Sequence, residues 1–339
     1  MQRSTVIMRI SRIHTLALLL LLIPFSGAWA QSKEKQDDLP TFKSQVNVVN
    51  LFFNVKDKHG LLMPNLAKDD FTVLEDGKPQ TIKYFTAETN QPLTLGIMID
   101  SSASQERVLD YEKEAGYEFL KQVLNDKDMA FVISFDVTVD LLQDFTNDNK
   151  SLKSALNRAR INTGGGGGSL PGLGGGPFPT STAPRGTLLY DAIYLGAHDK
   201  LSSEVGRKAM IILTDGEDQG SQLKIRDAIE AAQKADTICY VILIADRGFY
   251  AGGYGGDRSM KDLANNTGGR VIEASNKADK LRKAFDDIAK ELRSQYSIGY
   301  TPLNSKLDGS FRKIEIRTKE GYKIQTRSGY YAIKNETGD

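Results

Sequence analysis

The sequence predicts an α/β protein in which a doubly wound, mostly parallel sheet is inserted into a small β-sandwich built from the two flanks of the chain. Three observations lead to this prediction. Continuous apolar runs at residues 93–99 and 209–213 indicate strands buried on both faces of a sheet. Amphipathic helical patterns alternate with such runs between residues 92 and 294. Alternating β patterns with turn signals precede and follow this region.

Residues 1–30 have the pattern of a secretory signal peptide. Three arginines precede an apolar run at 16–25, and Ala28-Trp29-Ala30 supplies the small residues of a cleavage site. The run is shorter than the roughly 20 residues that a membrane span needs. We therefore expect an exported protein, periplasmic or extracellular, with no stable membrane insertion after cleavage. Residues 31–41 are polar and are expected to form a disordered lead-in.

The two β-rich flanks, residues 42–91 and 295–334, are expected to form one sandwich. The first flank has three strand patterns, and Asp76-Gly77 between two of them predicts a hairpin. The second has four, and residues 335–339 remain as a tail. Neither flank alone makes a convincing domain. A doubly wound domain that begins with a strand and ends with a helix has both termini at one edge of its sheet, so both linkers can reach the same neighbour.

The central region, residues 92–294, is expected to alternate strands and helices. One helix face is marked by Val108, Tyr111, Ala115, Phe119 and Val123, and the last helix covers 281–292. Further helices are expected near 152–159, 188–201, 225–235 and 260–265, and further strands at 129–135, 137–142, 238–245 and 270–272.

Composition excludes several classes of function. The 44 Lys and Arg residues nearly balance 43 Asp and Glu residues, which leaves no basic surface for nucleic acid. One cysteine and three histidines exclude a disulfide framework and a Cys-rich zinc site. Cys239 lies within an apolar strand pattern and is expected to be a buried core thiol.

Oxygen donors follow two of the predicted buried strands. One strand ends in Asp100-Ser101-Ser102-Ala103-Ser104 and the other in Thr214-Asp215-Gly216. In a doubly wound sheet such loops meet at the carboxyl ends of the strands. Carboxylates and hydroxyls suit Mg²⁺, Mn²⁺ or Ca²⁺ better than zinc. Because few of these donors are charged, a bound ion can still accept a carboxylate from another molecule. The alternative is that Asp100 and the serines only cap the helix that follows.

The two loops together resemble the von Willebrand factor A (VWA) domain and its metal-ion-dependent adhesion site (MIDAS). The resemblance covers about 200 residues and implies a Rossmann-like fold. It implies that Asp100, Ser102, Ser104, Thr187 and Asp215 bind a metal ion, most often Mg²⁺. Thr187 matches the family's threonine because it follows Gly186 and precedes a helical pattern. The flanks look like an exported bacterial group related to this domain. The implied function is non-enzymatic: cation-dependent protein binding in adhesion or assembly, through a carboxylate of the partner.

Three further features lie near the expected site. Residues 163–186 are a Gly- and Pro-rich insertion before Thr187, either a flexible spacer or a mobile lip. Phe249, Tyr250 and Tyr254 lie on a glycine-rich loop after another strand, either as ligand contacts or as local packing. Glu217 and Asp218 are candidates for indirect contact with the metal or for solvated loop charges.

Two other functions remain open. A metal-assisted hydrolase would need a base or nucleophile beside the ion, and the sequence has no H-E-x-x-H or G-x-S-x-G motif. A structural VWA protein would not use the site to capture a ligand. In the wider family, changes at the metal site can displace the last helix. Here that helix leads directly to Tyr296, so ligation could reorient the sandwich.

Overall fold

The computed structural model describes residues 48–87, 91–161, 186–244, 255–274 and 277–333. The predicted signal peptide, the lead-in, residues 163–185 of the insertion and the tail lie outside these residues. Within the described ranges, no helix has the length and apolar character that a membrane crossing requires.

The central sheet has six strands in the order β10-β9-β8-β5-β6-β7. Counted along the inserted domain, this is the doubly wound order 3-2-1-4-5-6, with the reversal between β5 and β8. All pairs are parallel except the edge pair of β6 and β7, as the sequence predicted for a mostly parallel sheet. The strands are β5 (Leu93–Asp100), β6 (Met129–Phe135), β7 (Val139–Thr146), β8 (Arg207–Thr214), β9 (Thr237–Leu243) and β10 (Val271–Glu273).

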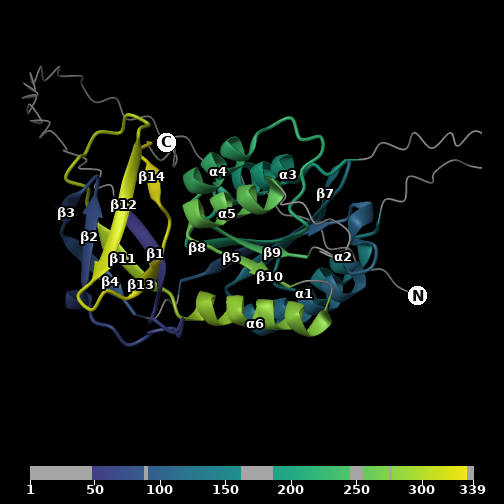
Figure 1. The fold of residues 1–339 in the computed structure, drawn as a ribbon, viewed down its shortest axis with the longest axis horizontal. Coiled ribbons are helices and arrows are strands. Elements are labelled where there is room, and N and C mark those ends of the chain that lie inside the picture. The colour runs from purple at the N-terminus through teal and green to yellow at the C-terminus, as the bar shows by residue number, and fades with distance from the viewer. Residues whose placement is uncertain (1–47, 88–90, 162–185, 245–254, 275–276, 334–339) are drawn as a thin grey trace, which may run out of the picture. The chain divides into compact units, whose positions relative to one another are not determined.

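Helices cover both faces of this sheet (Figure 1). Along β5, Ile97 and Ile99 pack with the helices of one face, whereas Met98 packs with those of the other. This alternation buries the whole strand and explains its unbroken apolar run. One face carries α1 (Leu109–Val123), α2 (Asn149–Arg158) and α6 (Ala278–Arg293); the other carries α3 (Leu189–Leu195), which a π-helical stretch continues over Gly196–Leu201, α4 (Ile225–Lys234) and α5 (Gly255–Thr267).

The flanks form two four-stranded sheets, each with strands from both ends of the chain. One sheet has the order β13-β1-β11-β4 and the other β14-β12-β2-β3. Their facing sides share one core, in which the rings of Phe53, Phe71 and Tyr296 lie within 5.4 Å of one another. The insertion of the α/β region into a sandwich is therefore confirmed. The strands are β1 (Val49–Lys56), β2 (Phe71–Glu75), β3 (Lys78–Gln80), β4 (Ile82–Thr86), β11 (Tyr296–Tyr300), β12 (Phe311–Thr318), β13 (Lys323–Gln325) and β14 (Gly329–Tyr331).

Two local predictions need correction, and one is confirmed. Asp76 and Gly77 have φ angles of 48° and 78°, as a tight turn between β2 and β3 requires. The strand expected after this turn is split into β3 and β4, so the N-terminal flank has four strands rather than three. Tyr111, expected on the buried face of α1, is 50% exposed. Its place on that face is taken by Glu112, three residues before Ala115.

The C-terminal turn of α6 is hydrogen-bonded to the sandwich. The carboxylate of Glu291, only 3% exposed, accepts hydrogen bonds from Lys56 Nζ at 2.9 Å, Arg270 Nε at 2.6 Å and Gln325 Nε2 at 3.1 Å. The backbone carbonyl of Glu291 also accepts a 2.8 Å bond from Asn54 Nδ2. Strands β1 and β13 are thereby joined to the last helix of the α/β domain.

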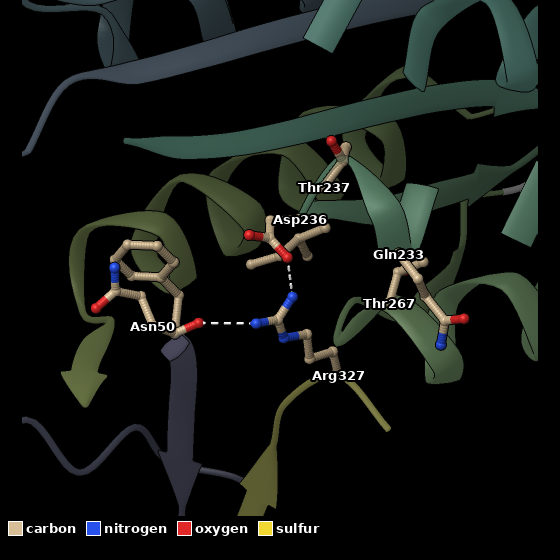
Figure 2. Close-up of a pocket in the computed structure, with 8 residues that line it drawn as sticks. Asn50, Gln233, Asp236, Thr237, Thr267 and Arg327 are labelled. Atoms are coloured by element: carbon tan, nitrogen blue, oxygen red, sulfur yellow. Dashed lines mark hydrogen bonds and ion pairs between the residues drawn. The ribbon is translucent and has the colours of Figure 1, made fainter. Parts of the chain in front are cut away.

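A second connection runs through the segment between β13 and β14. Arg327 forms an ion pair with Asp236 and donates a 2.9 Å bond to the carbonyl of Asn50, beside a small cavity (Figure 2). The amide of Ser328 donates to the carbonyl of Asn266 at 3.1 Å. Any reorientation of the sandwich would have to break both sets of contacts, so the linker after α6 is not a free hinge.

Candidate metal site

The candidate site lies where the strand order reverses. Strands β5 and β8 are parallel neighbours, and Ile99 is paired with Leu213. Asp100 and Asp215 therefore leave the sheet at the same edge, which is where ligands bind in doubly wound folds.

Asp100 is fully buried and held by both loops. Its Oδ1 accepts a 3.0 Å bond from the amide of Ser102, and its Oδ2 accepts a 2.7 Å bond from the hydroxyl of Thr214. The same hydroxyl accepts a 3.0 Å bond from the amide of Gly216. Thr214 thus joins the two loops. Thr214 was not among the residues predicted for the site, although its position directly before Asp215 was a usable signal.

The two carboxylates make the edge of the sheet strongly acidic. Burial, followed by the charge of the neighbouring Asp215, raises the pKa of Asp100 to about 7. The hydrogen bonds from Ser102 and Thr214 act in the opposite direction but do not cancel this effect. A cation between the two carboxylates would remove their repulsion, so the electrostatics fit a positively charged ligand.

The serine hydroxyls lie between buried Asp100 and solvent. Ser102 Oγ and Ser104 Oγ are 2.9 Å apart, with Ser102 buried and Ser104 exposed. Ser102 is the N-cap of a short 3-10 helix, Ala103–Gln105, yet its side chain accepts no capping hydrogen bond. The structure therefore gives no support to the alternative in which these hydroxyls only cap a helix.

The segment that carries Thr187 is attached to the loop after β8. Thr187 and Gln219 exchange two backbone hydrogen bonds of 3.0 Å, and Thr187 is 7% exposed. A Cβ on Gly186 would lie 2.6 Å from the carbonyl oxygen of Gln219, so this close approach requires glycine. The third predicted ligand segment is therefore brought to the loop of Asp215.

Asp136 is a further residue of this edge that sequence reasoning missed. It follows β6, and its Oδ2 accepts a 3.2 Å bond from Ser101 Oγ within the first ligand loop. Its backbone carbonyl accepts a 2.7 Å bond from Leu188, next to Thr187. Asp136 thus connects two ligand segments. An aspartate directly after a buried strand was the signal available.

The structure places the other predicted residues differently. Asp218 Oδ1 accepts bonds from the Tyr190 amide at 3.0 Å and the Ser221 hydroxyl at 2.6 Å, so it fixes the start of α3. Glu217 is half-buried, and its amide donates to Asp215 Oδ1 at 3.0 Å. Phe249, Tyr250 and Tyr254 lie outside the described residues.

The donor set fits a hard divalent ion. Among the described residues, no group of three or more His, Cys, Asp or Glu side chains is arranged to hold a metal. The donors brought together are instead two carboxylates with hydroxyls, all of them oxygen ligands of the kind that Mg²⁺, Mn²⁺ and Ca²⁺ prefer.

Three solved structures are among those similar to this chain. One is BatB from Bacteroides thetaiotaomicron, at 18% identity and TM-score 0.41 over 60% of this chain and 99% of that one. Another is the vWF domain of the type V pili tip protein Mfa5 from Porphyromonas gingivalis, at 14% identity and TM-score 0.44 over 60% of this chain and 96% of that one. The third is proximal thread matrix protein 1 from the mussel byssus with a zinc-occupied MIDAS motif, at 13% and 0.47, over 65% of this chain and half of that one. No family model and no curated protein matches the sequence.

The strand order and the position of the two acidic loops define the class of protein. A six-stranded doubly wound sheet carries D-x-S-x-S and T-D-G loops at its point of reversal. The chain therefore has a VWA-like fold, set in a sandwich made from both flanks.

Proposed function

We propose that this protein is an exported, divalent-cation-dependent binding module for adhesion or assembly. The cation is held by Asp100, Ser102, Ser104, Thr187 and Asp215, and it captures a carboxylate of a partner protein. The proposal is carried by one observation above all. Two like-charged carboxylates meet at the reversal point beside hydroxyls that cap no helix.

The charge balance supports capture of an anionic group. Two carboxylates only neutralise a divalent ion, and the hydroxyl ligands add no charge. The ion can therefore still attract a carboxylate oxygen from outside. Ser104 is exposed, which marks the side from which such a group can approach.

Mg²⁺ is the most suitable ion for this site. It binds through one or two carboxylates and keeps several water molecules, whereas Ca²⁺ takes six to eight oxygen ligands. A site with two carboxylates and neutral hydroxyls matches the first pattern better.

The rival function, metal-assisted hydrolysis, needs a base near the ion. Among the described histidines, His59 lies in an exposed sandwich turn, and His198 pairs with Asp199 in the π-helical stretch after α3. Neither position favours that function, so the binding function is preferred.

Calorimetric titration of Mg²⁺, Mn²⁺ and Ca²⁺ into the metal-stripped mature protein tests the proposal. We expect saturable binding in the wild type and in Asp110→Ala, whose carboxylate is 97% exposed on α1, but not in Asp100→Ala. Binding of a glutamate-bearing peptide, but not its glutamine twin, to the Mg²⁺-loaded protein would support capture of a carboxylate. Ion binding without peptide binding would favour a structural role, and an absence of ion binding would refute the proposal.

A further inference from the structure

Glu112 is a buried acidic residue that the proposed ligand set does not include. Glu112 is 1% exposed. It lies on the face of α1 from which Ala115 and Phe119 pack into the core. Within the described part of the chain, neither of its carboxylate oxygens has a hydrogen-bond partner. Lys113, the next residue, is paired with Asp110 at 3.3 Å instead.

Such a group destabilises a folded protein. A buried polar atom without a partner costs about 1–3 kcal/mol, and a buried charge costs more. Core packing alone would favour an apolar side chain at this position of α1. A residue that breaks this rule without local compensation indicates a functional position.

Glu112 lies in the first turn of α1, which directly follows the first ligand loop: its amide donates to the carbonyl of Val108 at 3.0 Å, and the amide of Val108 donates to the carbonyl of Gln105 at 3.0 Å. After burial, the charges of Asp100 and Asp215 are the main causes that raise the pKa of Glu112 well above its ordinary value. The residue is therefore within electrostatic reach of both metal-binding loops.

Gln105 is a second buried residue of this kind, directly after Ser104. It is 1% exposed, and its Nε2 lies 3.5 Å from Ser104 Oγ, but its Oε1 has no partner among the described residues. Gln105 Oε1 and at least one oxygen of Glu112, even in the neutral carboxyl that its raised pKa favours, are acceptors without a donor among the described residues. Water molecules bound to a cation are donors.

We propose that Glu112 and Gln105 form the inner wall of the cation site and accept hydrogen bonds from water molecules on the bound ion. This inference rests on the proposed function. Glu112 would act behind the ligands without adding a charge, because its raised pKa favours the neutral carboxyl. The arrangement favours Mg²⁺, which keeps several of its water molecules when bound to proteins.

The test compares Glu112→Gln and Glu112→Met with Glu114→Gln, an exposed glutamate on the same helix. For each protein, Mg²⁺ affinity is measured by calorimetry and the melting temperature is measured without metal. We expect both Glu112 variants to bind Mg²⁺ about tenfold more weakly or worse, as loss of a residue behind the ligands typically causes. Glu114→Gln should bind like the wild type.

The metal-free melting temperature separates a role in binding from a structural role. Glu112→Met removes two unpartnered polar atoms from the core, so we expect it to melt at a higher temperature than the wild type while binding Mg²⁺ more weakly. A lower melting temperature would make Glu112 a structural residue and overturn the inference. Wild-type affinity in both Glu112 variants would overturn it and leave the proposed function intact. No Mg²⁺ binding by the wild type would refute both.

Discussion

Two glutamates of the α/β domain, Glu112 and Glu291, are equally buried but differently surrounded. Glu291 is 3% exposed and accepts hydrogen bonds from Lys56, Arg270 and Gln325. Glu112 is 1% exposed and, among the described residues, accepts none. A buried carboxylate is stable when the fold supplies its donors. Where the fold supplies none, as at Glu112, burial instead raises the pKa of the carboxyl and favours its neutral form.

The comparison separates the two acidic regions of the domain by function. The partners of Glu291 come from three segments far apart in the sequence, so its role is to join the sandwich to α6. The acidic groups around Asp100 repel one another, which fits the cation site proposed there. The junction is thus organised for stability, whereas the reversal point of the sheet holds a repulsion that a bound cation would relieve.

Glu291→Ala gives the largest expected effect, because it removes the shared acceptor of the junction. We expect the free energy of unfolding to fall by about 3 kcal/mol, since Lys56 and Arg270 lose the buried acceptor that they share. The matched control is Glu230→Ala, which breaks an exposed pair with Lys234 and should change stability by less than about 1 kcal/mol. Urea unfolding measures both, and equal effects would contradict the structural role of Glu291.

Gly268→Ala tests the second connection of the junction. Gly268 has a φ of +86°, and an added Cβ would lie 2.6 Å from the amide nitrogen of Arg327. We expect a loss of about 2–3 kcal/mol, because backbone strain and a clash with backbone act together. Gly321 has a φ of +71°, and a Cβ added there would have nothing within 4 Å. Gly321→Ala should therefore lower the free energy of unfolding by only about 1 kcal/mol. Thermal unfolding of the two variants provides the comparison, and a smaller loss in Gly268→Ala would show that this contact is loose.

Thr214→Val tests the hydrogen bonds that hold the candidate metal site. It keeps the shape of the side chain but removes the hydroxyl that bonds Asp100 and Gly216. We expect Mg²⁺ affinity to fall by about tenfold. Thr214→Ser keeps the hydroxyl and should stay within about threefold of the wild type in the same calorimetric titration. A loss of equal size in Thr214→Ser would point to packing rather than to the hydrogen bonds.

The pH dependence of cation binding tests the same carboxylate without a substitution. Because the pKa of Asp100 in the metal-free protein is about 7, a proton competes with the ion below that pH. As the pH increases toward 7, Mg²⁺ affinity should rise by up to about tenfold per pH unit. Above pH 7 it should no longer change with pH. The folded state also holds this proton more tightly than the unfolded state, so metal-free stability should fall as the pH rises from about 4 to about 7. Titrations across this range measure both trends, and a flat profile would contradict them.

Local patterns were enough to predict much of the fold. The unbroken apolar run before Asp100 indicated a strand covered on both faces, and Asp76-Gly77 indicated its hairpin. The prediction at Tyr111 was wrong because Tyr111 and Glu112 lie four and three residues before Ala115, so both fall near the stripe that faces the core. The apolar pattern favours the tyrosine, but the fold buries the glutamate.

The sequence by itself determined the order of strands and helices and the oxygen donors after β5 and β8, because strand periodicity and loop motifs are properties of neighbouring residues. Only the tertiary structure decided that β11 pairs between β1 and β4, that Thr214 bonds Asp100, and that Asp136 connects two ligand segments. These contacts join residues that are distant in the chain. Their geometry follows from which strands are neighbours and how the cores pack, and a short stretch of sequence does not contain that information.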